Sequence, residues 1–507
     1  MADYLLADGI TPAAASRALA ELLEVRDGRL CVSDRAYYDT FDGLLHAAGL
    51  MAVWEDGQLA LIERASDRVR ARAQLRKPAR PFLAGDLEAG PLSDALQAVV
   101  EVRALLPVIE IHCRERPLDV LDGERKTVVR LRVQQPAVGR HRLRGRVHVA
   151  PVRGYDKALA RVTEALGREL GFVAADRPLV DDAITAAGGR PGGTPAKIEL
   201  ALARRQRADA AAAAVLKALL GVIQANLDGA IADIDIEFLH DLRVSVRRSR
   251  AVQRELRGVF PAQELAHFRT EFRWLQQVTG GVRDLDVYVL EFDELRALVP
   301  EQVRPDLDPL LALLRKRRSA ARRRMLRALR SERTSSVMAG WGDFVDRLET
   351  LPVEERPYAP RPVGTVAGER IAKVYRRMVK MGEAIDELSP PDEYHELRKQ
   401  GKELRYLLEL FGAPLYPDQV VRPMIRTLKG LQDVLGRHQD REIQVAMLRL
   451  IGPELSAAAD GPAALMAVGV LVQRLEADQR AARDAFARRF GAFASRRQRK
   501  QMGDTFP

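Results

Sequence analysis

Two segments of the sequence place a histidine and three cations at the spacing of one helix face. The first is HDLRVSVRRSR at residues 240–250, and the second is HELRKQGKELR at residues 395–405. On a helix, offsets of three, seven and ten residues span about 80° of arc and rise about 15 Å. Each segment therefore predicts a ladder of positive charge suited to an extended polyanion. The residues at these offsets are His240, Arg243, Arg247 and Arg250 in the first copy and His395, Arg398, Lys402 and Arg405 in the second.

The two ladders belong to a longer internal repeat. With 81 Lys and Arg in 507 residues, three basic matches after a given histidine arise by chance roughly 0.4% of the time, and the other six histidines lack the pattern. WLQQV at 274–278 followed by Gly280-Gly281 has its counterpart in GLQDV at 430–434 followed by Gly436. Two copies of one helical hairpin usually pack about a pseudo-twofold axis, which would bring the two ladders towards each other.

Each candidate residue also has a plain structural interpretation. A basic helix face is usually solvated and paired with acids on adjacent turns, although few acids flank these two ladders. The histidines could cap a helix or bond within the core. If they instead donate to phosphate, binding is expected to be tighter at pH 6 than at pH 8. Asp284 and Asp440 follow glycines, which favours helix N-terminal capping as their role. On the following helices, Arg273 and Lys429 are weaker site candidates.

Composition points to an anionic partner without naming it. The net charge is +11, yet the 70 acidic residues also permit ordinary salt-bridged helix surfaces. Cys31 and Cys113 are too few for a disulfide framework or a zinc cluster, which indicates a reducing compartment. The start MADYLLADGI lacks the features of a signal peptide, and the longest apolar run, around Pro462–Val472, is too short to cross a bilayer. We therefore expect a cytoplasmic protein without membrane contact.

The chain is expected to divide into an α+β part and a helical part. Residues 1–175 show antiparallel strand patterns, with hairpin turns at Asp56-Gly57 and Asp122-Gly123. Residues 176–197, which contain the Gly- and Pro-rich AAGGRPGGTP, are expected to be a linker. Residues 198–490 are expected to be helical, with halves at about 198–350 and 365–490 and with breaks at Gly280-Gly281 and Gly436. Residues 491–507 are expected to form a disordered basic tail.

On the two His-x-x-Arg helices and the two Leu-Gln…Gly…Asp segments, residues 200–490 resemble the CHAD domain. The resemblance implies two pseudo-symmetric four-helix bundles that enclose a basic pore or groove binding inorganic polyphosphate. It also implies that the most basic stretch of the chain, residues 315–330, lines that pore with Arg315, Arg318 and Arg322. No metal and no cofactor is expected.

Residues 1–175 are similar in outline to the CYTH domain, the barrel of triphosphate tunnel enzymes, through YYDTFDGLLHAAGLMAVWEDG at 37–57. That family opens with a Glu-x-Glu-x-Lys strand that holds metal, but the first strand here offers only Asp3 and Asp8. The strand VVRLRV at 128–133 carries Arg130 and Arg132 where acidic ligands are needed. We therefore expect a degenerate, barrel-like CYTH domain without triphosphatase activity.

Three functions remain in order of preference. The first is non-catalytic binding of inorganic polyphosphate, in association with polyphosphate granules. The second is a CYTH-type triphosphatase that uses other carboxylates, such as Glu63, Glu110 or Glu124. Nucleic-acid binding ranks lowest, because the ladders contain few aromatic residues and no base-reading motif. The sequence does not fix the oligomeric state.

Overall fold

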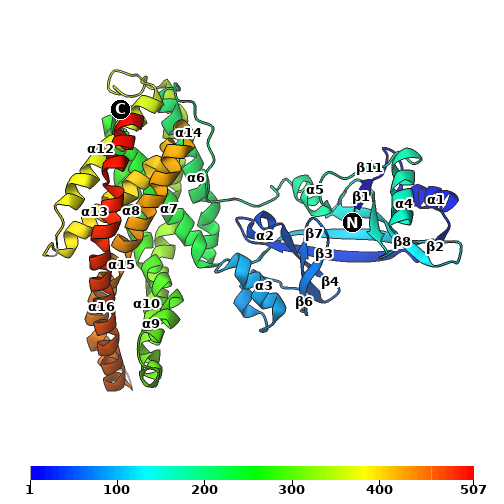
Figure 1. The fold of residues 1–507 in the computed structure, drawn as a ribbon, viewed down its shortest axis with the longest axis horizontal. Coiled ribbons are helices and arrows are strands. Elements are labelled where there is room, and N and C mark those ends of the chain that lie inside the picture. Colours follow the sequence, from blue (N-terminus) through cyan, green and yellow to red (C-terminus); the bar gives the residue numbers. More distant parts are fainter. Residues whose placement is uncertain (1, 387, 458–459, 507) are drawn as a thin grey trace. The chain divides into compact units, whose positions relative to one another are not determined.

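The computed structural model describes residues 2–386, 388–457 and 460–506. The chain divides into two compact units, Met1–Lys197 and Ile198–Pro507 (Figure 1). The first unit is built on an antiparallel sheet and the second is helical, so that the predicted order of an α+β part and an all-α part is confirmed.

The first unit contains one antiparallel sheet. Its strands are β1 (Ala2–Leu5), β2 (Val25–Asp27), β3 (Cys31–Asp39), β4 (Leu50–Glu55), β5 (Gln58–Glu63), β6 (Val69–Gln74), β7 (Leu106–Leu121), β8 (Thr127–Val138), β9 (His141–Arg142), β10 (Arg146–Pro151) and β11 (Val173–Ala174). They pair in the order β11-β1-β10-β8-β7-β3-β4-β5-β6, with β2 on β7 and β9 on β8. Among the described strands, β11 and β6 at the two ends do not pair with each other. The sheet is open, and the expected barrel closure is not confirmed.

Both predicted hairpins are present. Asp56 and Gly57 have φ of +48° and +79°, and Glu55 pairs with Gln58, which makes a two-residue turn with both central residues in the left-handed region. At the second hairpin the Asp122 carboxylate accepts the backbone N–H of Glu124 at 3.0 Å and of Lys126 at 2.9 Å. Asp and Gly form these turns because glycine and aspartate tolerate the left-handed region and the aspartate side chain can accept hydrogen bonds from the backbone of the turn.

Five helices cover the sheet. They are α1 (Pro12–Leu22), α2 (Leu44–Ala47), α3 (Pro91–Val100), α4 (Asp156–Arg168) and α5 (Leu179–Ala186). On one face, α1 and α4 pack against Leu131 and its neighbours, and α3 packs against Leu59. The alternation of side chains along a strand turns Tyr37 and Val53 to the opposite face, where α5 covers them.

The expected linker at 176–197 is largely part of the first unit. Its residues 179–186 form α5, which buries Ala183, and the Thr194 N–H donates to the Phe41 carbonyl at 2.9 Å. A Cβ on Gly43 would lie 2.2 Å from the Gly192 carbonyl oxygen. The glycines therefore permit close approach of two backbone segments, whereas the composition had suggested flexibility.

The second unit is a bundle of α-helices. They are α6 (Ala208–Ala232), α7 (Ile236–Glu255), α8 (Ala262–Leu290), α9 (Phe292–Ala297), α10 (Asp308–Leu329), α11 (Glu332–Arg347), α12 (Val363–Glu383), α13 (Pro391–Leu407), α14 (Ala413–Leu415), α15 (Asp418–Ser456), α16 (Gly461–Phe493) and α17 (Arg496–Thr505). Three expectations fail here. The chain does not break at Gly280-Gly281 or at Gly436, because α8 and α15 run through them. The tail is not disordered, because α17 buries Met502 and is followed by the buried Phe506.

The internal repeat extends over the bundle. The helices α12, α13 and α15 begin 155, 155 and 156 residues after α6, α7 and α8. Backbone hydrogen bonds join the segments before α6 and α12 in reciprocal pairs. The Ala208 N–H donates to the Arg361 carbonyl at 2.9 Å, and the Val363 N–H donates to the Gln206 carbonyl at 2.8 Å. Because each bond maps onto the other by the shift of 155 residues, the two halves are related by a pseudo-twofold axis.

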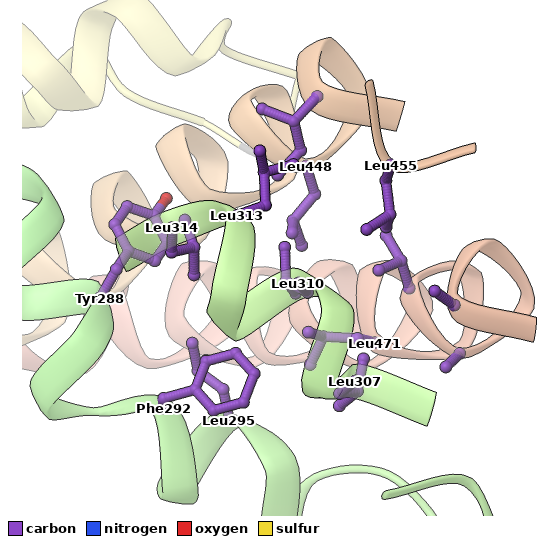
Figure 2. Close-up of a cluster of buried hydrophobic side chains, with 14 of the residues drawn as sticks. Tyr288, Phe292, Leu295, Leu307, Leu310, Leu313, Leu314, Leu448, Leu455 and Leu471 are labelled. Carbon is purple, nitrogen blue, oxygen red and sulfur yellow. The ribbon is translucent and has the colours of Figure 1, made fainter. Parts of the chain in front are cut away.

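The C-terminal parts of α8 and α15 and the helices that follow them, α9, α10 and α16, share one hydrophobic core. Figure 2 shows Tyr288 at the end of α8 and Phe292 of α9 packed near Leu310 of α10, with Leu448 of α15 and Leu471 of α16 in the same cluster. The helix α6 is long and apolar enough to span a membrane, with a mean hydropathy of 1.6, but 56% of that stretch is buried inside the structure. Such burial is typical of a core helix of a bundle.

Candidate anion-binding site

The first ladder lies on α7, and a side-chain cap defines the N-terminus of this helix. The Asp235 side chain accepts the N–H groups of Glu237 at 2.9 Å and Phe238 at 3.2 Å, which caps α7. Phe238, Leu242 and Val246 bury one face of α7. The second ladder lies on α13, where Pro391 occupies the first turn and Leu397 and Leu404 are buried.

The two ladder helices pack against each other across the pseudo-twofold axis. Arg248 of α7 pairs with Glu409 beyond the end of α13 at 2.9 Å, and Arg254 of α7 pairs with Glu403 of α13. In the repeat, Arg248 corresponds to Glu403 and Arg254 corresponds to Glu409. The two ion pairs are therefore images of each other, which is the pattern of a self-complementary contact.

Arg243 and Arg398 occupy equivalent positions above two glycines. Arg243 is buried and donates from Nη1 to the Gln276 carbonyl and to Thr279 Oγ1, both at 2.8 Å. Burial, and then Arg247 nearby, lower the pKa of Arg243 to about 10, so that it stays charged at neutral pH. Arg398 instead donates to Asp440 at 3.1 Å. A Cβ on Gly280 would lie 3.6 Å from the Arg243 guanidinium, and one on Gly436 would lie 3.8 Å from that of Arg398.

Arg247 and Lys402 are the equivalent cations one turn further along. Both are half-buried, and neither has an ion pair or a hydrogen bond to any residue that the structure describes. Burial first, and then Arg398 and Arg247, lower the pKa of Lys402 to about 7, against the opposing effect of Asp440. Because α7 and α13 contact each other, Arg247 and Lys402 are close enough to interact electrostatically.

We call these residues the central cluster: Arg243, Arg247, Arg398 and Lys402, with the carboxylates of Asp284 and Asp440. Asp284 and Asp440 lie inside continuous helices, so they are not the N-terminal caps that the glycines suggested. Four cations face two acids here, which leaves a net positive charge in a partly desolvated place. An anion is the group that such a place can bind.

A second basic region lies at the other end of the α7 ladder. Arg250 bonds to the Gln276 side chain, and its pKa is lowered by burial and then by Arg254, Arg273 and Arg269. The pKa of Arg254 is lowered mainly by burial, and Arg377 of α12 contributes in the same direction. This outer patch comprises Arg250, Arg254, Arg269, Arg273 and Arg377. Arg254 follows Arg250 by four residues and so could have been found in the sequence. Arg377 carries no such signal.

The remaining predicted residues differ in their surroundings. Arg405 of α13 approaches Glu409 at 3.6 Å and lies 5.6 Å from the ring centroid of the buried Tyr406. Lys429 of α15 is exposed and has no ion pair to a described residue. Its counterpart in the first repeat is Arg273 of the outer patch.

The two histidines lie beside acids. His395 Nδ1 lies 2.7 Å from Gln439 Oε1, and Glu442 is close enough to interact electrostatically with both His395 and Asp392. The ligand atoms of Glu237, His240 and Asp241 all lie within 4.8 Å of one another, a grouping that could hold a divalent cation. The structure therefore places both histidines at the acidic start of each ladder.

The α10 arginines do not join the central cluster as a set. Arg318 pairs with Asp233 at 2.7 Å and with Asp286 at 2.5 Å, and Arg322 pairs with Asp233 at 3.1 Å. These bonds fasten α10 to the end of α6 and to α8, and the two arginines lower the pKa of Asp233 against the effect of its burial. Arg315 is exposed and without an ion pair to any described residue. Arg315 and Arg318 line one hollow together, whereas Arg318 and Arg322 are also held by acids, so that the lining of a pore by all three stays a prediction.

In the first unit the candidate catalytic carboxylates are bound to separate cations. Glu63 pairs with Arg68 and Arg70, and hydrogen bonds from Ser66 first and then from these arginines lower its pKa to about 2. Glu110 pairs with Lys77 at 2.7 Å and Glu124 with Lys126 at 2.6 Å. On the first strand, Asp3 bonds to Arg146 at 3.0 Å and lies 2.7 Å from His148. The side chains of Arg130 and Arg132 on β8 are exposed, and Arg132 lies 3.7 Å from the carboxylate of the buried Glu115.

Comparisons with known proteins bear on the second unit. The family model of the CHAD domain matches residues 214–449. Two curated relatives, each an uncharacterized protein of Mycobacterium tuberculosis, are 31% identical over 227 residues, which is 42% of this chain and only 40% of theirs. The crystal structure of the CHAD domain from the plant Ricinus communis is similar with a TM-score of 0.50 and 26% identity, covering 58% of this chain and 96% of that one. PptA from Streptomyces chartreusis has a TM-score of 0.43 and 20% identity, covering 56% and 99%.

Proposed function

We propose, from the premise that residues 214–449 form a CHAD domain, that this protein binds inorganic polyphosphate without catalysing its turnover. The CHAD family is linked to polyphosphate binding, and a chain of phosphates is an extended polyanion of the kind that the two ladders fit. The binding site is the central cluster, and the outer patch continues it along the polymer. Cytoplasmic polyphosphate granules are the proposed location.

Arg247 and Lys402 carry this proposal. A half-buried cation with no protein partner raises the free energy of the folded state, because it has lost water without gaining an opposing charge. Two such cations occupy equivalent positions of the repeat and lie near each other. A polymer with one negative charge on each successive phosphate can contact both at once. Phosphate oxygens also match the planar donor set of Arg247.

Binding is tested by titrating the full-length protein with fluorescently labelled polyphosphate at several salt concentrations. Replacement of both cations, Arg247→Gln with Lys402→Gln, removes about two phosphate contacts and is expected to lower affinity about a hundredfold, with a flatter dependence on salt. The matched control is Arg140→Gln with Arg142→Gln, which removes the same charge from exposed positions of the first unit that have no ion pair to a described residue. Equal affinity of wild type and the cluster variant would exclude this site.

The first unit is proposed to be a degenerate CYTH-like domain that does not hydrolyse triphosphate. The local ion pairs of Glu63, Glu110 and Glu124 support this, because each carboxylate is bound to its own cation and the three do not converge on one metal position. Phosphate release from tripolyphosphate with Mg²⁺ or Mn²⁺ tests the claim. Turnover well above that of a heat-inactivated sample would show an enzyme.

A preference for polyphosphate over nucleic acid is part of the proposal. The central cluster consists of four cations and two carboxylates, and the nearby Tyr288 is buried. None of these described residues therefore offers an open aromatic ring on which a base could stack. Competition of polyphosphate against single-stranded RNA and duplex DNA at physiological salt measures the preference. Displacement of bound polyphosphate by either nucleic acid at equal phosphate concentration would contradict it.

A further inference from the structure

The nine cations of α10, counting Arg330 at its end, fall into two groups according to whether they pair with an acidic residue. Three face the protein and have acidic partners: Arg317 pairs with Glu454 at 2.5 Å, and Arg318 and Arg322 pair as described above. The other six are exposed, and none of them has an ion pair or a side-chain hydrogen bond to a residue that the structure describes: Arg315, Lys316, Arg323, Arg324, Arg327 and Arg330. The dense basic run thus contains a structural face and a solvent face.

Four of the exposed cations form a straight row. Lys316, Arg323, Arg327 and Arg330 lie within about 60° of arc on α10 and rise over about 21 Å along its axis. No acidic residue occurs between positions 309 and 331 of the sequence. Dissolved salt screens the repulsion between exposed like charges, so the row destabilises the fold little and is not by itself evidence of a ligand. The other side chains on this face indicate which kind of partner can bind.

We infer that the outer row of α10 is a second contact for inorganic polyphosphate, separate from the central cluster, and that it engages chains too long for that cluster to hold. This inference rests on the proposed function and extends it to a preference for long chains. The stretch 309–330 has no aromatic side chain for stacking a base. The positions beside the cations on this face are Ala312, Ser319 and Ala320, whose small side chains offer little apolar surface for insertion into a lipid interface.

The row also has a route towards the central cluster. Exposed Arg315 lines a hollow with Ile236, the first residue of α7, and with Asp286 of α8. Asp286 follows Asp284 of the central cluster by two residues, so that the two side chains leave α8 about 200° apart. A flexible phosphate polymer must therefore bend around α8 from the central cluster to reach Arg315 and then the row. One chain can then neutralise cations on α7, α13 and α10 together.

The test uses the full-length variant Lys316→Gln, Arg323→Gln, Arg327→Gln and two probes, tripolyphosphate and long-chain polyphosphate. Loss of three contacts is expected to lower the affinity for long chains at least about tenfold and to reduce the slope of log affinity against log salt by about two. The affinity for tripolyphosphate, which we expect to occupy the central cluster alone, is expected to be unchanged. Because these side chains are exposed and unpaired, thermal unfolding should be unaffected.

The control is Arg140→Gln, Arg142→Gln, Arg153→Gln, which removes three exposed charges from the first unit. If the control weakens long-chain binding as much as the α10 variant does, net charge alone explains the effect and the row is no site. Unchanged long-chain affinity in the α10 variant also overturns the inference while leaving the central cluster in place. If wild type binds neither probe, the proposed function itself fails.

Discussion

Arg247 of α7 and Lys402 of α13 occupy equivalent positions of the two repeats, and each is a half-buried cation in the field of the other. Their chemistry differs in one respect. An arginine keeps its charge at any physiological pH, whereas a lysine whose pKa has fallen to about 7 titrates there. The site therefore combines a permanent charge with one that depends on pH.

The pH dependence of binding follows from Lys402. A bound polyanion favours the charged amine and raises its pKa, so that binding takes up a proton above pH 7. The affinity for polyphosphate is expected to fall about tenfold between pH 6 and pH 8 at fixed salt. Lys402→Arg should abolish most of this dependence, while His395→Gln should retain it. If the pH dependence instead persists in Lys402→Arg and is lost in His395→Gln, it originates from His395.

Arg243 and Arg247 are expected to separate stability from binding. Arg243 is buried and bonded to the Gln276 carbonyl and Thr279, so Arg243→Ala should lower the free energy of unfolding by about 1–3 kcal/mol. Arg247→Gln removes a cation that has no ion pair to a described residue and should leave stability unchanged or slightly higher, while weakening polyphosphate binding. Urea unfolding monitored by circular dichroism measures the first effect. A similar loss of stability in both variants would mean that Arg247 is also structural.

Gly436 tests whether α15 is continuous. In the interior of a helix alanine is more stable than glycine by roughly 0.5–1 kcal/mol. A Cβ at this position would meet the Arg398 guanidinium at 3.8 Å, an ordinary contact. Gly436→Ala is therefore expected to raise the midpoint of thermal unfolding without changing the affinity for tripolyphosphate. A lower midpoint would indicate that the chain turns at Gly436.

The C-terminal helix is expected to contribute to stability. Phe506 is 1% exposed, and its ring centroid lies 4.6 Å from that of Tyr416. Phe506→Ala should lower the free energy of unfolding by about 3 kcal/mol, because it removes a buried aromatic side chain and leaves a cavity. The neighbouring exposed Asp504→Ala serves as the control. Equal stability of the two variants would contradict the packing of this segment.

The sequence predicted the repeat and the ladders well because both depend on short-range periodicity. The spacing of Arg243 and Arg247 on one helix and of Arg398 and Lys402 on the other determines that each pair shares a face. The repeat made it expected that the two faces approach each other, because such copies usually pack about a pseudo-twofold axis. Partners could not be predicted in the same way. That Arg318 pairs with Asp233 depends on a contact between residues 85 positions apart. The breaks expected at Gly280 and Gly436 were wrong because tertiary packing outweighed the local preference of glycine.

The reciprocal ion pairs of Arg248 and Arg254 relate the two ladder helices by a pseudo-twofold axis, so that a polymer can bind between them in either of two orientations. A binding site formed by two equivalent helices offers nearly the same sequence of charges to a strand approaching from either side. A nucleic acid has distinct 5′ and 3′ ends and would be read differently in the two orientations. A homopolymer with two identical ends binds with the same affinity in both orientations, so that both contribute to the occupancy of the site.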